Sequence, residues 1–267
     1  MKTTPKITSV KNPIVQRFCS SAVGDPPGVM VAEGVRLVGE ALDAELTFLE
    51  AAYSSRLMRN EAGRGLRRRL REVAPILYEC SDKVLERISS LDSSPGVSAV
   101  LRRPSWSFSD LLGDGIPLLV VVAGVRDPGN LGAVVRAAEA AGATGLMTLS
   151  GGADPYRDKA LRGSAGSIFR LPTLSAVKPG ELVELAAREG LQLVLAEVGD
   201  DGGGEYTEVD FRSPTALVLG DECGGIPEVV RTAAQAVTRV PMAAPVESLN
   251  VAVAAGILLY EVRRQRR

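Results

Sequence analysis

From residue 117 onward, short apolar runs alternate with segments of helical periodicity, and this alternation limits the possible folds more than any other sequence feature. The runs have the length of buried strands and occupy residues 117–124, 144–150, 191–198, 215–220 and 236–240. Amphipathic helical segments lie at 130–142, 180–189, 226–235 and 249–264. Strands that alternate with helices form a mostly parallel sheet covered on both faces, and such sheets bind ligands at the carboxyl ends of their strands. We therefore predict an α/β fold.

A smaller α/β domain precedes this region. Strand-like runs at 29–34 and 46–53 enclose a helical segment at 35–44, and an arginine-rich helix follows. The stretch RRPSWSFSDLLGDGIP, residues 102–117, mixes Pro, Ser and Gly as interdomain linkers do. We expect a first domain over residues 1–105, a linker over 106–116 and a second domain over 117–267.

The composition excludes several classes of protein. The 267 residues include no histidine, so a Ser-His-Asp triad, a histidine general base and the common His-containing zinc sites are excluded. The three cysteines form no Cys-x-x-Cys pair, and we expect neither a disulfide framework nor a metal site. No run reaches the roughly 18 apolar residues of a membrane span, and the N-terminus lacks a signal-peptide core. We expect a soluble, cytoplasmic protein without membrane attachment.

Positive charge is concentrated in one part of the first domain. The whole chain has a net charge of −1, which excludes a surface committed entirely to nucleic acid. Between residues 56 and 71, however, one acid, Glu61, opposes seven arginines: Arg56, Arg59, Arg64, Arg67, Arg68, Arg69 and Arg71. A solvated outer helix face would explain such a run. Because the guanidinium group favours phosphate contacts and base stacking, we interpret the cluster as a candidate RNA or DNA interface.

The glycine-rich loops do not match the common nucleotide-binding motifs. After the apolar run at 117–124 the sequence reads GVRDPGNLG, in which Asp127 stands where the dinucleotide fingerprint G-x-G-x-x-G requires glycine. A P-loop requires a Gly-Lys pair, and the chain contains none. The sequence therefore disfavours both a Rossmann dehydrogenase and a P-loop NTPase.

One segment with polar residues suited to chemistry follows the first strand of the second domain. It reads NLGAVVRAAE, and we expect Asn130 to cap the helix that begins there. On this helix Arg136 lies about 140° from Leu131, off the apolar stripe. Arg136 therefore points away from the sheet, either as a solvated surface residue or as a functional one.

Two further segments of this kind lie near the C-terminus. LVLGDECGGIP, residues 217–227, places Glu222 in a glycine-rich loop after a strand, where an ordinary strand-to-helix turn is the simpler explanation. VPMAAPVESLNVAVAA, residues 240–255, contains a strand end, a loop and a Ser-Leu-Asn helix start. There Ser248 or Asn250 can serve as a helix N-cap or as a functional residue.

Together the three segments resemble the motifs of the SpoU/TrmH family of RNA ribose 2′-O-methyltransferases. The patterns N-x-G-x-x-x-R-x-A, L-V-L-G-x-E-x-x-G-I-P and V-P-M-x-x-x-x-E-S-L-N-V-A-V-A follow the family's order over residues 130–254, and KALRGSAG at 159–166 is similar to another family segment. The first domain resembles the family's small substrate-binding domain at residues 29–42 and 80–101. The resemblance thus covers almost the whole chain.

The resemblance implies a fold, a cofactor and a quaternary state. Family members have a parallel α/β domain whose C-terminal stretch forms a deep trefoil knot, act as homodimers and use S-adenosyl-L-methionine. In the family the knot loops hold the cofactor largely through main-chain groups, which corresponds here to Leu219, Gly220, Val240, Met242 and Leu249. The implied RNA contacts are the arginine cluster together with Arg162 and Ser164.

The implied reaction is methyl transfer to a ribose 2′-hydroxyl of RNA, an in-line displacement that needs no metal. The resemblance places these residues around the reacting ribose: Asn130, Arg136, Glu222, Ser248 and Asn250. A second subunit can complete this site. Because a guanidinium has a pKa above about 12, we expect Arg136 to grip a phosphate and stabilise the developing alkoxide rather than act as the base. The proton acceptor stays open.

The resemblance leaves the substrate open between two kinds of RNA. Large-subunit rRNA is the expected substrate, because the separate N-terminal domain resembles that of rRNA-directed relatives, and tRNA is the alternative for the same chemistry. A catalytically idle RNA-binding or ribosome-assembly factor is the alternative from the binding class. The intact set of five polar residues counts against that idle factor.

Overall fold

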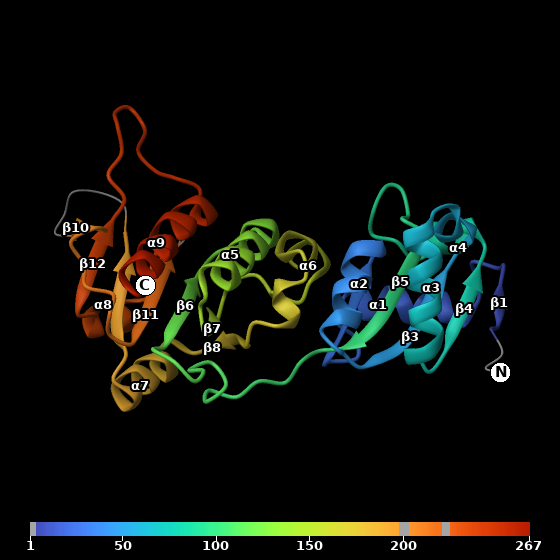
Figure 1. The fold of residues 1–267 in the computed structure, drawn as a ribbon, viewed down its shortest axis with the longest axis horizontal. Helices are drawn as coiled ribbons and strands as arrows, with labels where there is room; N and C mark the ends of the chain where they lie inside the picture. Colours follow the sequence, from blue (N-terminus) through green and yellow to red (C-terminus); the bar gives the residue numbers. More distant parts are fainter. Residues whose placement is uncertain (1–3, 198–202, 221–224) are drawn as a thin grey trace. The chain divides into compact units, whose positions relative to one another are not determined.

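The computed structural model describes residues 4–197, 203–220 and 225–267, which form two compact units (Figure 1). The first unit contains Met1–Pro104 and Tyr156–Phe169, and the second contains Ser105–Pro155 and Arg170–Arg267. Within the described ranges, no helix is long and apolar enough to span a bilayer. Each unit has its own sheet and its own core.

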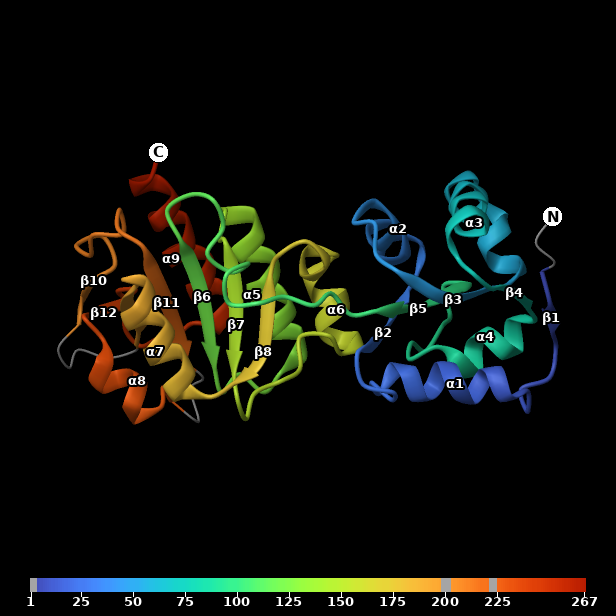
Figure 2. The same ribbon diagram turned by 90° about the horizontal axis from the view of Figure 1, so that it is seen from below.

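The first unit is a mixed sheet between two layers of helices. Its strand order is β1-β4-β3-β5-β2, and β5 runs antiparallel to both of its neighbours. The strands are β1 (Lys6–Ile7), β2 (Val29–Glu33), β3 (Phe48–Tyr53), β4 (Leu77–Cys80) and β5 (Val97–Arg102). The helices are α1 (Pro13–Ala22), α2 (Val35–Asp43), η1 (Ser55–Arg59), α3 (Glu61–Val73), α4 (Asp82–Ile88), α6 (Asp158–Ser164) and η2 (Ser167–Phe169). Figure 2 shows α1 and α4 on one face and α2 and α3 on the other.

The second unit is a parallel sheet of seven described strands. Its order is β10-β12-β9-β11-β6-β7-β8, and every neighbouring pair is parallel. The strands are β6 (Leu118–Ala123), β7 (Gly145–Leu149), β8 (Thr173–Val177), β9 (Gln192–Ala196), β10 (Gly204–Glu205), β11 (Thr215–Gly220) and β12 (Ala236–Arg239). Helices α5 (Pro128–Ala141) and α9 (Val251–Gln265) cover one face, and α7 (Pro179–Glu189) and α8 (Glu228–Ala233) the other (Figure 2). This confirms the predicted parallel α/β fold; the knot stays a prediction.

The start of α5 differs from the sequence prediction. The helix begins at Pro128, and its N-cap is Asp127, whose carboxylate accepts a 2.8 Å hydrogen bond from the backbone N–H of Asn130. Proline fits the first helical position because its missing N–H has no partner there in any case. Asn130 therefore lies inside the first turn, which leaves its side-chain amide available for other contacts.

The segment 156–169 belongs to the first unit although it follows β7 of the second unit in sequence. The Arg162 guanidinium donates a 3.1 Å hydrogen bond to Ser90 Oγ, and the Arg103 guanidinium lies 5.1 Å from the ring centroid of Tyr156. At Gly166, which has a φ of +95°, an added Cβ would lie 2.6 Å from Cβ of Glu40. The chain thus crosses between the units three times. A compact unit is not necessarily a domain that folds by itself. The predicted domain boundaries at residues 105 and 117 therefore stay a proposal.

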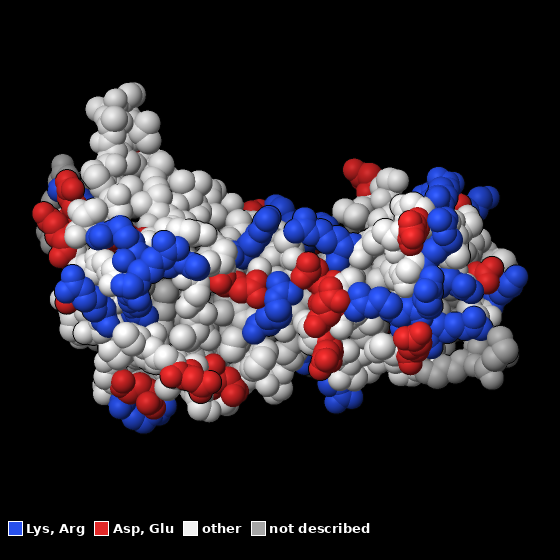
Figure 3. Space-filling view, in the orientation of Figure 1, with Lys and Arg blue, Asp and Glu red and all other residues white. Residues whose placement is uncertain are grey.

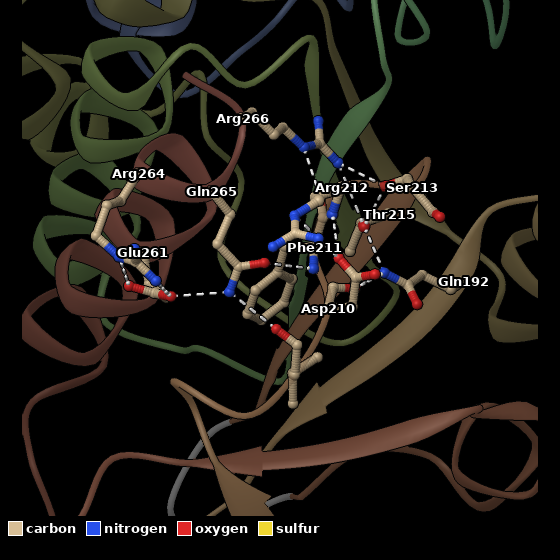
Figure 4. Close-up of polar contacts among 11 residues, drawn as sticks. Gln192, Asp210, Phe211, Arg212, Ser213, Thr215, Glu261, Arg264, Gln265 and Arg266 are labelled. Carbon is tan, nitrogen blue, oxygen red and sulfur yellow. Dashed lines mark hydrogen bonds and ion pairs between the residues drawn. The ribbon is translucent and has the colours of Figure 1, made fainter.

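The C-terminal end of α9 is fixed to the amino ends of the central strands (Figure 4). The Arg266 guanidinium donates to the carbonyl oxygens of Phe211, Ile116, Pro117 and Ser213, at distances of 2.7, 2.8, 3.1 and 2.7 Å. Burial lowers the pKa of Arg266. One turn earlier, hydrogen bonds from Arg264 hold the pKa of Glu261 below its usual value. Because α9 runs antiparallel to the strands, its other end lies at their carboxyl ends.

Candidate functional site

Two of the predicted catalytic residues meet at the carboxyl ends of the strands. The side-chain amide of Asn250 donates a 3.0 Å hydrogen bond to Oδ1 of Asn130. The Oδ1 atom of Asn250 also accepts a 2.9 Å hydrogen bond from the backbone N–H of Ala252, so Asn250 is the N-cap of α9. Asn250 therefore caps the helix and also joins the first and third sequence segments. Its functional role stays a prediction.

The other predicted catalytic residues stand apart from this pair. Arg136 is exposed on α5, as its helical position predicts, and no side chain of the described ranges forms a hydrogen bond or an ion pair with it. Ser248 is half-buried two residues before the α9 cap. Glu222 lies outside the described residues. The structure thus brings together Asn130 and Asn250 and leaves the guanidinium of Arg136 open to solvent.

A pocket with a volume of about 250 Å³ opens beside Asn250, whose chain neighbours Leu249 and Val251 line it. All five residues predicted to bind the cofactor line it: Leu219, Gly220, Val240, Met242 and Leu249. Further apolar walls come from Ile226, Val251, Ala254 and Leu258. A Cβ added at Gly220 would lie 3.1 Å from Cγ1 of Ile226, so only glycine leaves this wall undisturbed. The pocket can take a flat, largely apolar group.

One end of the pocket is polar, and sequence reasoning did not find it. Its side chains are Glu197 and Arg231, which form an ion pair, together with Thr238 and Arg239. Thr238 on β12 is fully buried, and its hydroxyl has no hydrogen-bond partner among the described residues. A glutamate directly after an apolar strand was the available signal, because the carboxyl ends of parallel strands are where ligands bind.

The predicted RNA-contacting arginines fall into two groups. Arg56 is half-buried in ion pairs with Asp82 and Glu86, and Arg69 pairs with Asp43 at 2.6 Å. These two arginines therefore join elements of the fold. The remaining arginines of the cluster form no ion pair with any described residue: Arg59, Arg64, Arg67, Arg68 and Arg71.

The arginines of α3 without an ion pair share one side of that helix. Arg64, Arg67, Arg68 and Arg71 recur at intervals of three and four residues, opposite the buried Leu66 and Leu70. The Arg67 guanidinium lies over the Tyr53 ring, 5.2 Å from its centroid, and Arg64 donates a 3.1 Å hydrogen bond to the carbonyl oxygen of Met58. Figure 3 shows basic side chains gathered along α3.

Arg162 and Ser164, also predicted to contact RNA, lie on α6. Arg162 is partly exposed and contacts Asp158 and Ser90. Ser164 is fully buried, and its hydroxyl donates a 2.8 Å hydrogen bond to the carbonyl oxygen of Leu161. This burial argues against direct contact between Ser164 and RNA.

Among the residues that the structure describes, the other reactive groups offer no second site. The thiol of Cys80 is buried, and burial raises its pKa to about 12, so the nucleophilic thiolate is scarce at neutral pH. The described part of the chain contains no cluster of three or more Cys, Asp or Glu able to hold a metal ion.

Comparisons with known proteins agree with this arrangement. The SpoU rRNA Methylase family model matches residues 117–260. A 23S rRNA (uridine(2479)-2′-O)-methyltransferase of Streptomyces viridochromogenes is 36% identical over 193 residues, covering 69% of this chain and 66% of that protein. An uncharacterized tRNA/rRNA methyltransferase of Synechocystis is 33% identical over 97% of this chain and 94% of its own length. The chain thus spans just under two thirds of the Streptomyces relative and nearly all of the Synechocystis one.

Solved structures extend the likeness to both units. An AdoMet-bound rRNA methyltransferase from Sinorhizobium meliloti has a TM-score of 0.86 and 29% identity, with 98% of each chain covered. The SpoU methyltransferase AviRb from Streptomyces viridochromogenes, in complex with AdoMet, has a TM-score of 0.84 and 28% identity over 96% of this chain and 98% of that one.

Proposed function

This chain belongs to the SpoU rRNA methylase family, and we propose that it transfers a methyl group from S-adenosylmethionine to a ribose 2′-hydroxyl of RNA. One observation carries the proposal: the Asn130–Asn250 contact and the glycine-lined pocket lie together at the carboxyl ends of β6, β11 and β12. This is the edge at which parallel sheets bind their ligands.

The pocket fits the cofactor. Its apolar walls suit an adenine face, and because Gly220 has no side chain, a ligand can approach the main chain at this wall of the pocket. The buried hydroxyl of Thr238 has no described partner, and a polar group of the ligand could satisfy it. When bound, the cofactor supplies an electrophilic methyl group on a sulfonium.

The residues around the pocket would position the ribose and stabilise charge. In-line transfer requires the hydroxyl oxygen, the methyl carbon and the sulfur to be nearly collinear. Asn130 and Asn250 are held to each other, and with Ser248 and Glu222 they would orient the nucleoside. Arg136 is exposed, so it is free to grip an RNA phosphate and stabilise the developing alkoxide.

The proposed substrate is large-subunit rRNA. The support is the 36% identical Streptomyces relative, which is named as a 23S rRNA methyltransferase, and the arginine-bearing face of α3. The same chemistry on tRNA is the second candidate, because the Synechocystis relative is named for both kinds of RNA. In either case phosphate contacts by α3 would make the affinity for RNA salt-dependent.

Family likeness also supports a homodimer with a knotted second unit, in the cytoplasm. On α9, Val253 and Tyr260 are about half exposed although both are largely apolar, and their separation of seven residues places them on the same side of the helix. A second copy of the chain that covers this side would remove its apolar surface from water. Sedimentation of the purified protein tests the dimer.

The function is tested by incubating the purified protein with total RNA and S-adenosylmethionine carrying a labelled methyl group. We expect a 2′-O-methyl mark at a defined position of 23S rRNA, mapped by protection of that nucleotide's 3′ phosphodiester from alkaline hydrolysis. Cofactor binding without methyl transfer to any RNA would identify an idle RNA-binding factor. Transfer to tRNA alone would assign the second candidate.

A further inference from the structure

We propose that Thr238 and Glu197 hold the ribose hydroxyls of the cofactor's nucleoside, as the polar end of a pocket whose other walls are apolar. This inference rests on the proposed cofactor site and adds side-chain recognition to the main-chain contacts expected there. Neither residue lies in the three sequence segments that carry the family motifs.

The first observation is the side chain of Thr238. It is fully buried on β12 and lines the pocket, and its hydroxyl has no hydrogen-bond partner among the described residues. A buried hydroxyl without a partner is destabilising, so such groups are rare unless a ligand or water completes their hydrogen bonds. A hydroxyl can donate and accept, and it therefore matches another hydroxyl.

The second observation is the carboxylate of Glu197. It directly follows β9, and its backbone N–H donates a 3.0 Å hydrogen bond to the carbonyl oxygen of Thr238, which fixes the two residues side by side. The Glu197 side chain is one quarter exposed and lines the same pocket. Its partner is Arg231 of α8, which also lines the pocket.

The Glu197–Arg231 ion pair determines which group of the cofactor can bind at the polar end of the pocket. Because Arg231 already neutralises Glu197, an ammonium group would gain little from the carboxylate while losing its own hydration. A pair of neighbouring hydroxyls can instead donate to the carboxylate oxygens without adding charge. The ribose of an adenine nucleoside carries such a pair, next to the base that the apolar walls accommodate.

Thr238→Val gives the sharpest test, because the proposal predicts opposite effects on stability and on binding. Valine removes an unpaired buried hydroxyl, so the unliganded protein is expected to unfold at an equal or higher temperature. The affinity for S-adenosylhomocysteine, measured by calorimetry, is expected to fall about tenfold. If Thr238 had a purely structural role, the substitution would lower the unfolding temperature and the affinity together. Unchanged affinity would overturn the assignment of Thr238.

Glu197→Gln tests the carboxylate, and Glu228→Gln is the matched control. Glu228 also contacts Arg231, at 3.9 Å, but its side chain is 83% exposed and does not line the pocket. We expect Glu197→Gln to weaken S-adenosylhomocysteine binding about three- to tenfold, since charge-assisted hydrogen bonds are roughly twice as strong as neutral ones. Glu228→Gln is expected to bind as the wild type does. Equal losses of affinity in the two variants would mean that each acts by disturbing Arg231, which both glutamates contact. That result would overturn the assignment of Glu197.

A ligand lacking one hydroxyl identifies the group that is recognised. The wild type is expected to bind S-adenosylhomocysteine at least tenfold more tightly than its 2′-deoxy or its 3′-deoxy analogue, and Thr238→Val or Glu197→Gln should reduce that ratio. If the ratio is unchanged, and Glu197→Gln weakens the binding of S-adenosylhomocysteine but not of an analogue without the amino group, the carboxylate binds the ammonium and the proposal is wrong. A wild type that binds none of these ligands would instead overturn the proposed function.

Discussion

The side-chain amide of Asn250 donates a hydrogen bond to Oδ1 of Asn130 across 3.0 Å, although the two residues are 120 positions apart in sequence. Asn130 lies in the first turn of α5, and Asn250 is the N-cap of α9. The contact therefore ties the starts of two neighbouring helices at the edge of the sheet where the pocket opens.

Asn250→Ser and Asn250→Ala separate capping from positioning. Serine can still accept the hydrogen bond of an N-cap but is too short to reach Asn130, so its free energy of unfolding should stay within about 0.5 kcal/mol of the wild type, whereas alanine should cost about 1 kcal/mol. Both variants should methylate RNA about tenfold more slowly. Urea unfolding and single-turnover assays measure the two effects. A serine variant with the wild-type rate would reduce Asn250 to a helix cap.

Arg136→Ala should leave stability nearly unchanged. The side chain is exposed and contributes no core volume, so the free energy of unfolding should change by at most about 0.5 kcal/mol. Loss of the guanidinium should slow methyl transfer about a hundredfold at saturating cofactor, as removal of an oxyanion donor does. Arg136→Lys should recover part of the rate, because lysine keeps the charge without the planar fork.

Arg188→Ala is the control for Arg136→Ala. Arg188 lies on α7 with a side chain 61% exposed and pairs with the adjacent Glu189, on the other face of the sheet from α5. The control should methylate at the wild-type rate. If Arg136→Ala keeps more than about a third of that rate, its guanidinium is a solvated surface group.

Gly220→Val should abolish cofactor binding in a protein that still folds. The added Cβ would lie 3.1 Å from Cγ1 of Ile226, and the two further methyl groups are expected to crowd the pocket that both residues line. Gly180→Val is the control, because a Cβ at Gly180 meets nothing within 4 Å. Calorimetry with S-adenosylhomocysteine and circular dichroism measure binding and folding. Unaltered affinity in Gly220→Val would remove this glycine from the cofactor site.

Replacing Arg64 and Arg68 together by alanine should weaken RNA binding more than Arg69→Ala does. The first two lie on the open side of α3, whereas the third pairs with Asp43. The slope of log affinity against log salt concentration should flatten by about 0.7 to 0.9 for each phosphate that the variant no longer neutralises. Filter binding at several salt concentrations measures the slope, and S-adenosylhomocysteine affinity should not change. Identical slopes in the wild type and both variants would make the α3 arginines a solvated surface.

Arg266→Ala should destabilise the second unit by about 2 kcal/mol or more, because it leaves several backbone carbonyl oxygens without their donor (Figure 4). The neighbouring Arg267 is exposed, and Arg267→Ala should have no measurable effect on stability. Chemical unfolding of both variants provides the comparison, and equal stabilities would show that solvent satisfies these carbonyls as well as Arg266 does.

Long apolar strands and helices were predictable from local sequence. Thr215–Gly220 matches its predicted range, because all but its last residue are buried and polar residues precede it. The strand Thr173–Val177 was missed because its middle residues are partly or fully exposed and give little hydrophobic signal. For α5, two residues three positions apart could cap the helix, and Pro128 at the first helical position favours Asp127.

Part of the candidate site depends on contacts that no local pattern encodes. The apolar lining of the pocket was predicted through the motifs that resemble a family. The Glu197–Arg231 pair and the unpaired Thr238 come from three separate places, the end of β9, α8 and β12, which only the order of the strands brings together. The engagement of Arg56 and Arg69 with nearby carboxylates was hidden for the same reason, since their partners lie on α4 and α2.

The membership of residues 156–169 in the first unit has a consequence for synthesis. A ribosome releases residues 1–104 early, but the first unit lacks α6 until residue 169 has emerged. By then residues 105–155, which supply β6, α5 and β7 of the second unit, are already outside. The two units therefore mature in overlapping order. A gene fragment that stops at residue 104 encodes an incomplete first unit, in which the Ser90 hydroxyl lacks the hydrogen bond from Arg162.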